Sequence, residues 1–176
     1  MRTVCKILVA LFALVGVSGC SAMSDEMPSV YEKSTIVRVG DIAPDFTVNM
    51  VDGSSVTLSQ LQGRTVLLVF FATWSADGRM QLSLMKDMLQ EFDSEKFSLL
   101  TISTSEEMAD VQEFINEKNY TFPVGVDSDG SIFQLYATEY LPRCFVIDPL
   151  GRIVALSADY NKTEFELLCR VITSLM

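Results

Sequence analysis

The sequence contains no histidine and few basic residues. Without histidine the chain cannot use a Ser-His-Asp triad, a Cys-His pair, a histidine-ligated metal or an imidazole switch near neutral pH. The 13 lysines and arginines stand against 23 aspartates and glutamates, which gives a formal net charge of −10. This balance excludes nucleic acid as a partner, because phosphate binding requires clustered basic side chains. We expect neither a metal nor an organic cofactor.

The chain also lacks an apolar run long enough to cross a bilayer near its start. Residues 7–17 are apolar, but a spanning helix needs about 20 such residues. Two basic residues precede this run, and Val17-Ser18-Gly19-Cys20 follows it, which resembles the lipobox of bacterial lipoproteins. The resemblance implies that residues 1–19 are a cleaved signal peptide and that the Cys20 thiol is acylated. The protein would then lie in the bacterial cell envelope, held to the membrane by that lipid and facing the periplasm or the surface. An ordinary cleaved signal or a short anchor is the alternative.

The rest of the chain is predicted to be a tether and one domain. Residues 20–37 are polar and mixed, as in a linker, and residues 38–176 show no repeat or low-complexity segment. A hydrophobic fraction of 49% in 176 residues suffices for a core without a metal or disulfide staple.

Hydrophobic periodicity predicts an α/β domain with a three-layer architecture. Strands and helices alternate, and a pair of strands and a helix follow at the end. The run at residues 65–73 is apolar throughout, as in a central strand covered on both faces. The predicted elements are a hairpin at 46–50 and 56–58, strands at 65–73, 97–103, 122–126, 143–148 and 153–157, helices from Leu84 to Phe92 and at 106–118 and 163–175, and a helical turn at 132–136.

Five blocks of sequence carry a family resemblance. They are residues 40–46 (GDIAPDF), 70–74 (FFATW), 122–124 (FPV), 141–142 (LP) and 145–154 (FVIDPLGRIV). In this order they resemble the thioredoxin-like proteins, and among them the membrane-anchored TlpA/ResA-like thiol–disulfide oxidoreductases of the AhpC/TSA superfamily. The resemblance implies a thioredoxin fold with an N-terminal β-hairpin extension and a cis peptide bond between Leu141 and Pro142.

The sequence departs from this family at the residues that carry its chemistry. The family has Cys-x-x-Cys after the tryptophan, whereas Trp74 is followed here by Ser75-Ala76-Asp77-Gly78. A serine oxygen cannot take part in disulfide exchange, and Gly78 has no side chain. Val69 and Gln81 stand where the family has a buried polar residue and a glutamate that handle protons for the thiols. The pattern predicts a redox-inactive site on a preserved scaffold, with Ser75 as a cap and Asp77 as the N-cap type at the helix start.

Two cysteines remain in the predicted domain. Cys144 falls in an interior strand and Cys169 on the apolar face of the last helix, so we interpret both as buried apolar side chains. A disulfide between them, favoured by an oxidising envelope, and a single reactive Cys144 are the alternatives.

The family's groove binds extended polypeptide beside the cis-proline loop, a mode that needs no thiol. The resemblance places Trp74, Tyr140, Leu141 and Pro142 in that groove, with Arg143 at its edge. The leading hypothesis is a lipid-anchored binding or accessory module for a protein or peptide. The alternatives are a thiol–disulfide oxidoreductase or antioxidant-family enzyme, acting through Cys144 or with a partner's thiol, and a purely structural lipoprotein.

Overall fold

The computed structural model describes residues 30–88, 92 and 95–176. The predicted signal peptide, Cys20 and part of the predicted helix face, at Leu89, lie outside the described residues. Along the chain the elements are α1 (Val30–Lys33), β1 (Thr47–Met50), β2 (Ser55–Thr57), the 3-10 helix η1 (Leu58–Leu61), β3 (Thr65–Phe71), α2 (Ala76–Met88), β4 (Phe97–Thr104), α3 (Met108–Lys118), β5 (Val124–Asp127), the 3-10 helix η2 (Phe133–Leu135), β6 (Arg143–Ile147), β7 (Ile153–Ala158) and α4 (Lys162–Leu175).

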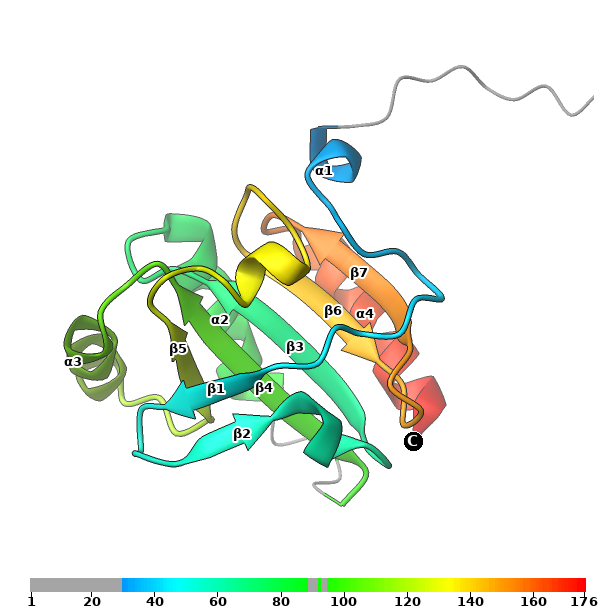
Figure 1. Cartoon of the computed structure of the whole chain (residues 1–176), viewed down its shortest axis with the longest axis horizontal. Coiled ribbons are helices and arrows are strands. Elements are labelled where there is room, and N and C mark those ends of the chain that lie inside the picture. Colours follow the sequence, from blue (N-terminus) through cyan, green and yellow to red (C-terminus); the bar gives the residue numbers. More distant parts are fainter. Residues whose placement is uncertain (1–29, 89–91, 93–94) are drawn as a thin grey trace, which may run out of the picture.

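The strands form a single seven-stranded sheet in the order β2-β1-β5-β4-β3-β6-β7. β3, β4 and β5 are parallel to one another, and β6 and β1 flank them in antiparallel orientation. The connections β3-α2-β4 and β4-α3-β5 step in the same direction across the sheet. Because such crossovers are right-handed, α2 and α3 lie on the same face. Figure 1 shows α2 and α4 behind the sheet, with η2 and the segment leading to β1 in front.

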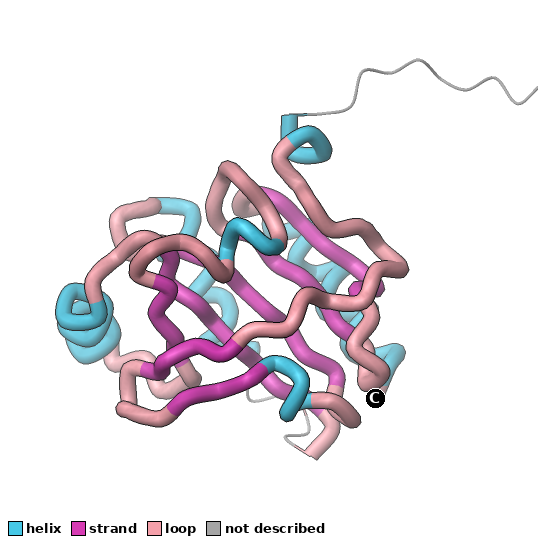
Figure 2. The backbone as a smooth tube through the Cα atoms, viewed as in Figure 1, coloured by secondary structure: helices cyan, strands magenta, loops and turns pink. Residues whose placement is uncertain are grey.

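Two hydrophobic clusters cover the two faces of the sheet. One cluster lies under the helices and contains Leu82, Val111 and Phe165, one from each of α2, α3 and α4. The other contains Val37, Phe46 and Phe133, from the chain before β1 and from η2. The sheet therefore lies between a helical layer and a layer of loops and 3-10 helices, as the tube view also shows (Figure 2). The predicted α/β thioredoxin fold is confirmed.

The predicted N-terminal hairpin is β1 and β2, which pair from Thr47–Thr57 to Asn49–Ser55. β1 joins the main sheet along β5, where Met50 lies opposite Gly125. A Cβ atom at Gly125 would lie 2.7 Å from a methyl group of Val48, so only glycine allows this close approach.

The folded domain begins earlier than the sequence predicted. Residues 30–37, expected to be part of a tether, form α1 and a segment that packs on the domain, with Val37 6% exposed in the core. The backbone N–H of Ile36 donates to the Tyr136 carbonyl over 2.9 Å. In the described chain, none of the helices combines the length and apolar character that crossing a membrane requires.

Candidate functional site

The candidate site lies where β3 runs into α2. All seven residues of β3 are buried, and the strand pairs antiparallel with β6 so that Phe70 lies opposite Arg143. This register brings the turn after β3 and the loop before β6 to one end of the sheet, the upper end in Figure 1. Trp74 and Pro142, predicted to share a groove, therefore come from neighbouring segments at that end.

The predicted groove residues differ in exposure. The Trp74 side chain is 70% exposed and that of Tyr140 is 43% exposed, whereas Leu141 is half-buried and Pro142 is buried. The Leu141–Pro142 peptide bond is cis, as the resemblance implied. Within the described chain the backbone N–H and C=O of Leu141 have no hydrogen-bond partner. These two groups can bond to an added strand. Tyr140 lies in the same loop, and Trp74 lies in the turn after β3.

Ser75, which the resemblance places at the family's first cysteine, caps α2. The Ser75 Oγ accepts a hydrogen bond from the Gly78 N–H over 3.1 Å, and the Ser75 carbonyl accepts from the Arg79 N–H. The prediction that Ser75 is a cap is confirmed. The assignment of Asp77 as the N-cap is wrong, because α2 begins at Ala76 and Asp77 lies in its first turn.

The resemblance places Gly78 at the family's second cysteine. The backbone is tightly packed around this glycine. A Cβ atom there would lie 2.9 Å from the Ala72 carbonyl oxygen and 3.4 Å from the Ser75 Cβ. A cysteine at this position would therefore require the turn or the helix to shift. Position 78 is thus closed to a side chain by the local backbone.

A carboxylate behind the turn was missed by sequence reasoning. Glu106 accepts hydrogen bonds from the Thr73 N–H over 2.8 Å, from the Thr73 hydroxyl and from the Ser103 hydroxyl. On the other side, the Arg79 guanidinium donates to the Thr73 carbonyl over 2.8 Å. These contacts fix the residue directly before Trp74. The sequence could have predicted this contact. Glu106 follows β4, and the carboxyl ends of neighbouring parallel strands meet at one edge of a sheet, so Glu106 lies near the end of β3.

Arg143 is not at the edge of the groove, as predicted, but inside the domain. Its side chain is 1% exposed and donates to the carbonyls of Glu139 and Tyr140. It also donates to the hydroxyls of Ser34 and Thr35, which precede β1. Burial lowers the pKa of the Arg143 guanidinium. Since arginine stays charged even so, Arg143 ties the cis-proline loop to the N-terminal segment by charge-assisted hydrogen bonds.

The N-terminal segment reaches the same loop through Tyr31. Its ring meets that of Tyr140 edge-on, with 5.1 Å between centroids, and its hydroxyl donates to the Asp159 carboxylate over 3.0 Å. This hydrogen bond raises the pKa of Tyr31. Sequence reasoning missed this contact, because residues 20–37 were interpreted as a tether.

The two cysteines of the domain lie in the helix-covered core. Cys144 is 1% exposed, and Cys169 is half-buried against the same cluster. They are not joined by a disulfide, so the disulfide alternative is not realised in this structure. Burial raises the pKa of the Cys144 thiol to about 12. A thiol of this kind stays protonated near neutral pH, and the thiolate is the nucleophile in disulfide exchange.

Val69 in β3 and Gln81 in α2 are the other two positions at which the resemblance implies a departure from the family. Val69 is fully buried and lies opposite Cys144 in the sheet, and Gln81 is 1% exposed. The Nε2 atom of Gln81 is buried without a hydrogen-bond partner. Among the described residues, no three Cys, Asp or Glu side chains gather closely enough to hold a metal ion.

Comparisons with known proteins show the family and the fold. The model of the AhpC/TSA family matches residues 39–156. The thiol-disulfide oxidoreductase ResA of Oceanobacillus iheyensis is 34% identical over 152 residues, which cover 84% of this chain and 76% of that protein. A candidate protein disulfide isomerase from Bacteroides thetaiotaomicron superposes with a TM-score of 0.76 at 36% identity, covering 81% of this chain and 92% of that one. The pneumococcal exposed lipoprotein thioredoxin Etrx1 shares the fold, with a TM-score of 0.66 at 23% identity over 75% of this chain and all (100%) of that one.

Proposed function

Because the chain belongs to the AhpC/TSA family and is a TlpA/ResA-like protein with a thioredoxin fold, we propose that it is a lipid-anchored envelope protein that binds extended polypeptide without redox turnover. Relatives of this chain are named thiol–disulfide oxidoreductases, whereas the function proposed here involves no thiol–disulfide exchange. The binding groove is retained, and the sulfur atoms are replaced.

The observation that carries the proposal is the pair of residues at the start of α2. The Ser75 oxygen is engaged as a helix cap, and position 78 has no room for a side chain beside the Ala72 carbonyl. Disulfide exchange proceeds by attack of a thiolate on a sulfur atom, and a hydroxyl cannot replace either partner. The start of α2 therefore supplies neither the attacking nor the resolving group.

The groove keeps what strand addition needs. The unpaired backbone groups of Leu141 can each bond to an extended peptide, and Trp74 and Tyr140 offer exposed aromatic area for its side chains. The contacts of Glu106 with Thr73 and of Arg143 with the loop hold both sides of the groove in place before a ligand arrives. Such preorganisation reduces the entropy cost of binding.

Membrane anchoring is proposed at Cys20, on the evidence of the sequence preceding it. The similarity to a protein named an exposed lipoprotein thioredoxin supports this assignment. Mass spectrometry of the protein purified from membranes tests it directly. We expect acyl chains on Cys20, and an unmodified Cys20 or a retained leader would refute anchoring.

Redox turnover is tested by insulin reduction. The purified, reduced protein is compared with a heat-denatured sample and with a ResA-type oxidoreductase as a positive control. We expect a rate equal to that of the denatured sample. Sustained turnover above it would overturn the non-redox proposal.

Binding is tested with the carboxymethylated insulin B chain, an extended probe without thiols. We expect Trp74→Ala to weaken its binding at least tenfold in fluorescence anisotropy. The matched control is Leu167→Ala, because Leu167 is 51% exposed and lies on α4, which packs on the helix-covered face of the sheet. Equal effects of the two substitutions would argue against the groove. Absence of binding together with absence of turnover would favour a structural lipoprotein.

An oxidoreductase acting through Cys144 is the second candidate. The names of the relatives favour it, and the burial of Cys144 opposes it. Alkylation with iodoacetamide, followed by mass spectrometry of the Cys144 peptide, separates the two. Modification of the native protein within minutes would favour the enzyme, and modification only after unfolding would favour the binding module.

A further inference from the structure

An apolar surface on the N-terminal side of the domain is not used by the groove. We define the strap as residues 34–46, which connect α1 to β1. Its side chains Ile36, Val39 and Ile42 are 51%, 61% and 58% exposed, and Leu150, in the turn between β6 and β7, is 74% exposed. In the described chain these are four of nine exposed large hydrophobic side chains. Exposed apolar side chains on one segment and the turn paired with it are candidates for an interaction surface, whereas scattered ones are not.

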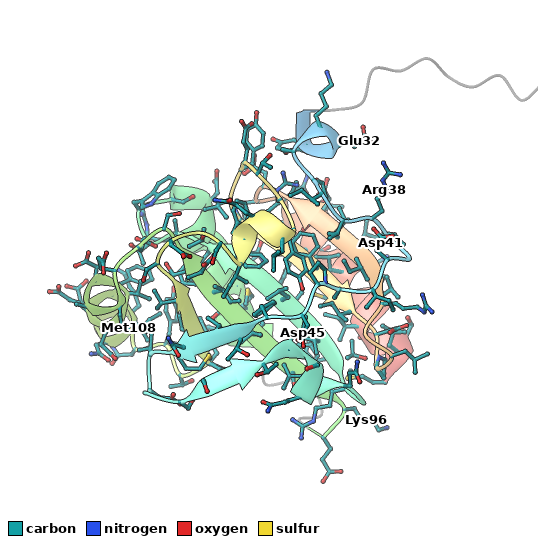
Figure 3. The ribbon with its side chains drawn as sticks, in the orientation of Figure 1. Glu32, Arg38, Asp41, Asp45, Lys96 and Met108 are labelled. Carbon is teal, nitrogen blue, oxygen red and sulfur yellow. The ribbon has the colours of Figure 1, made fainter. Side chains whose placement is uncertain are left out.

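The strap and the β6–β7 turn form one continuous surface. Ile42 bridges to Arg152, and the Ala43 N–H donates to the Gly151 carbonyl over 2.9 Å. The Gly40 N–H donates to the Ile153 carbonyl over 2.8 Å at the start of β7. Figure 1 shows the strap descending along the β7 side of the sheet, and Figure 3 shows Arg38 and Asp41 on its outer side. We call this the strap surface: Ile36, Arg38, Val39, Ile42, Leu150 and Arg152.

The strap surface is electrically unlike the rest of the domain. From residue 30 onward the chain has 11 basic and 21 acidic residues, a net charge of 11 − 21 = −10. Residues 30–46 and 148–152 contribute three basic and four acidic residues (Lys33, Arg38 and Arg152 against Glu32, Asp41, Asp45 and Asp148), so nine of the ten excess acidic charges lie elsewhere. Of these acids, Asp41 accepts the Arg38 N–H, and Asp148 accepts the N–H groups of Leu150 and Arg152.

The path of the chain identifies what covers this surface. The strap directly follows α1, and Tyr31 comes 31 − 20 = 11 residues after Cys20. Eleven residues reach at most about 40 Å. An anchor at Cys20, which belongs to the proposed function, therefore keeps α1 and the start of the strap within about 40 Å of the bilayer. We propose that the strap surface contacts the membrane, with its apolar side chains in the interface and Arg38 and Arg152 toward anionic headgroups.

Charge and tethering both favour this orientation. Anionic lipid repels the strap, whose charges nearly balance, less than it repels the acidic remainder of the domain. Four apolar side chains bind a bilayer weakly, but a tether turns the contact into an intramolecular event at high effective concentration. The groove then has a fixed orientation relative to the membrane.

The test replaces native anchoring with an artificial tether. Residues 20–176, with Cys20→Ser and an N-terminal hexahistidine, are held on phosphatidylcholine–phosphatidylglycerol vesicles that contain a nickel-chelating lipid. In a Trp74→Phe background, tryptophan is placed at Val39 or Ile36 on the strap. The matched control places it at Leu167, which is 51% exposed on α4. Circular dichroism verifies that each variant is folded.

We expect brominated phospholipid to quench the strap tryptophans at least twofold more than the tryptophan at position 167, with a blue shift only when vesicles are present. Equal quenching at the three positions would overturn the proposal. A blue shift that depends on protein concentration without vesicles would overturn it too, because it would assign the surface to a second copy of the chain. The artificial tether keeps this result separate from acylation of Cys20, which mass spectrometry measures independently.

Discussion

Arg143 follows the cis-proline directly and carries its positive charge into the domain. Its guanidinium joins carbonyls of the cis-proline loop to hydroxyls of the N-terminal segment. None of these hydrogen-bond partners is a carboxylate. The buried charge is stabilised by their oriented dipoles, by the Tyr31 ring, whose centroid lies 6.0 Å from the guanidinium carbon, and by the electrostatic attraction of Asp159. Removing the guanidinium leaves buried acceptors without donors, which is among the costly kinds of substitution.

We expect Arg143→Ala to lower the free energy of unfolding by about 3 kcal/mol, measured by urea denaturation. The control is Arg79→Ala, since Arg79 is exposed and makes its hydrogen bond to Thr73 at the surface. Its expected cost is about 0.5–1 kcal/mol. If the two substitutions cost the same, Arg143 does not clamp the loop to the N-terminal segment.

Cys144 makes the stability of the domain depend on pH in the alkaline range. Its pKa is about 12 in the folded protein, against about 8.5 in an unfolded chain. Above about pH 8.5 the unfolded state releases the proton that the folded state keeps, so alkali favours unfolding. Stability is therefore fully present below that pH and declines as the pH rises toward 12.

Between about pH 7.5 and 9.5 we expect the free energy of unfolding to fall by about 1 kcal/mol more in the wild type than in Cys144→Ala. Urea denaturation at both pH values provides the measurement. Cys169→Ala serves as the control and should retain the wild-type dependence. A Cys144→Ala protein with an unchanged pH profile would show that this thiol is not the group responsible.

At the scale of elements, α2 shows how a serine side chain caps the start of a helix. The first turn needs an acceptor for its unpaired N–H groups, and Ser75 supplies one to Gly78. The cap is thus preserved by a side chain that has no sulfur. Gly78 then lets the turn at Ala72 approach the helix closely.

The cap assignment leads to a paired prediction. Ser75→Ala should destabilise the protein by about 1 kcal/mol in urea denaturation, because the Gly78 N–H loses its acceptor. Asp77→Ala should cost about 0.5 kcal/mol or less, since Asp77 only interacts with the helix dipole from the first turn. The opposite order would restore Asp77 as the N-cap.

At the scale of the whole molecule, the charge balance opposes compaction. A net charge of −10 over 176 residues produces self-repulsion in the folded state that salt screens. We expect the free energy of unfolding to rise by about 0.5–1 kcal/mol between low and moderate NaCl concentrations. Thermal unfolding across a NaCl series measures this, with sucrose as an uncharged control for the cosolvent. A fall in stability with salt would mean that attractive ion pairs dominate.

The sequence alone was sufficient for the α/β architecture, the hairpin extension and the cap at Ser75. These features depend on local patterns: an uninterrupted apolar run for β3, spacings of three and four for the helices, and a residue type suited to a helix start. The absence of sulfur at positions 75 and 78 also needs no structure, because it is a matter of composition.

Other features depend on contacts between segments that are far apart in the sequence, so only the tertiary structure shows them. The interior place of Arg143 depends on residues 34 and 35, which lie more than 100 positions away in the chain (sequence separations of 108 and 109). Glu106 reaches Thr73 because β3 and β4 are parallel neighbours, and the packing of residues 30–37 depends on acceptors such as the Tyr136 carbonyl. From local sequence alone, a polar segment is interpreted as a linker. Its hydrogen bonds and its burial depend on a second segment, and local sequence describes only the first.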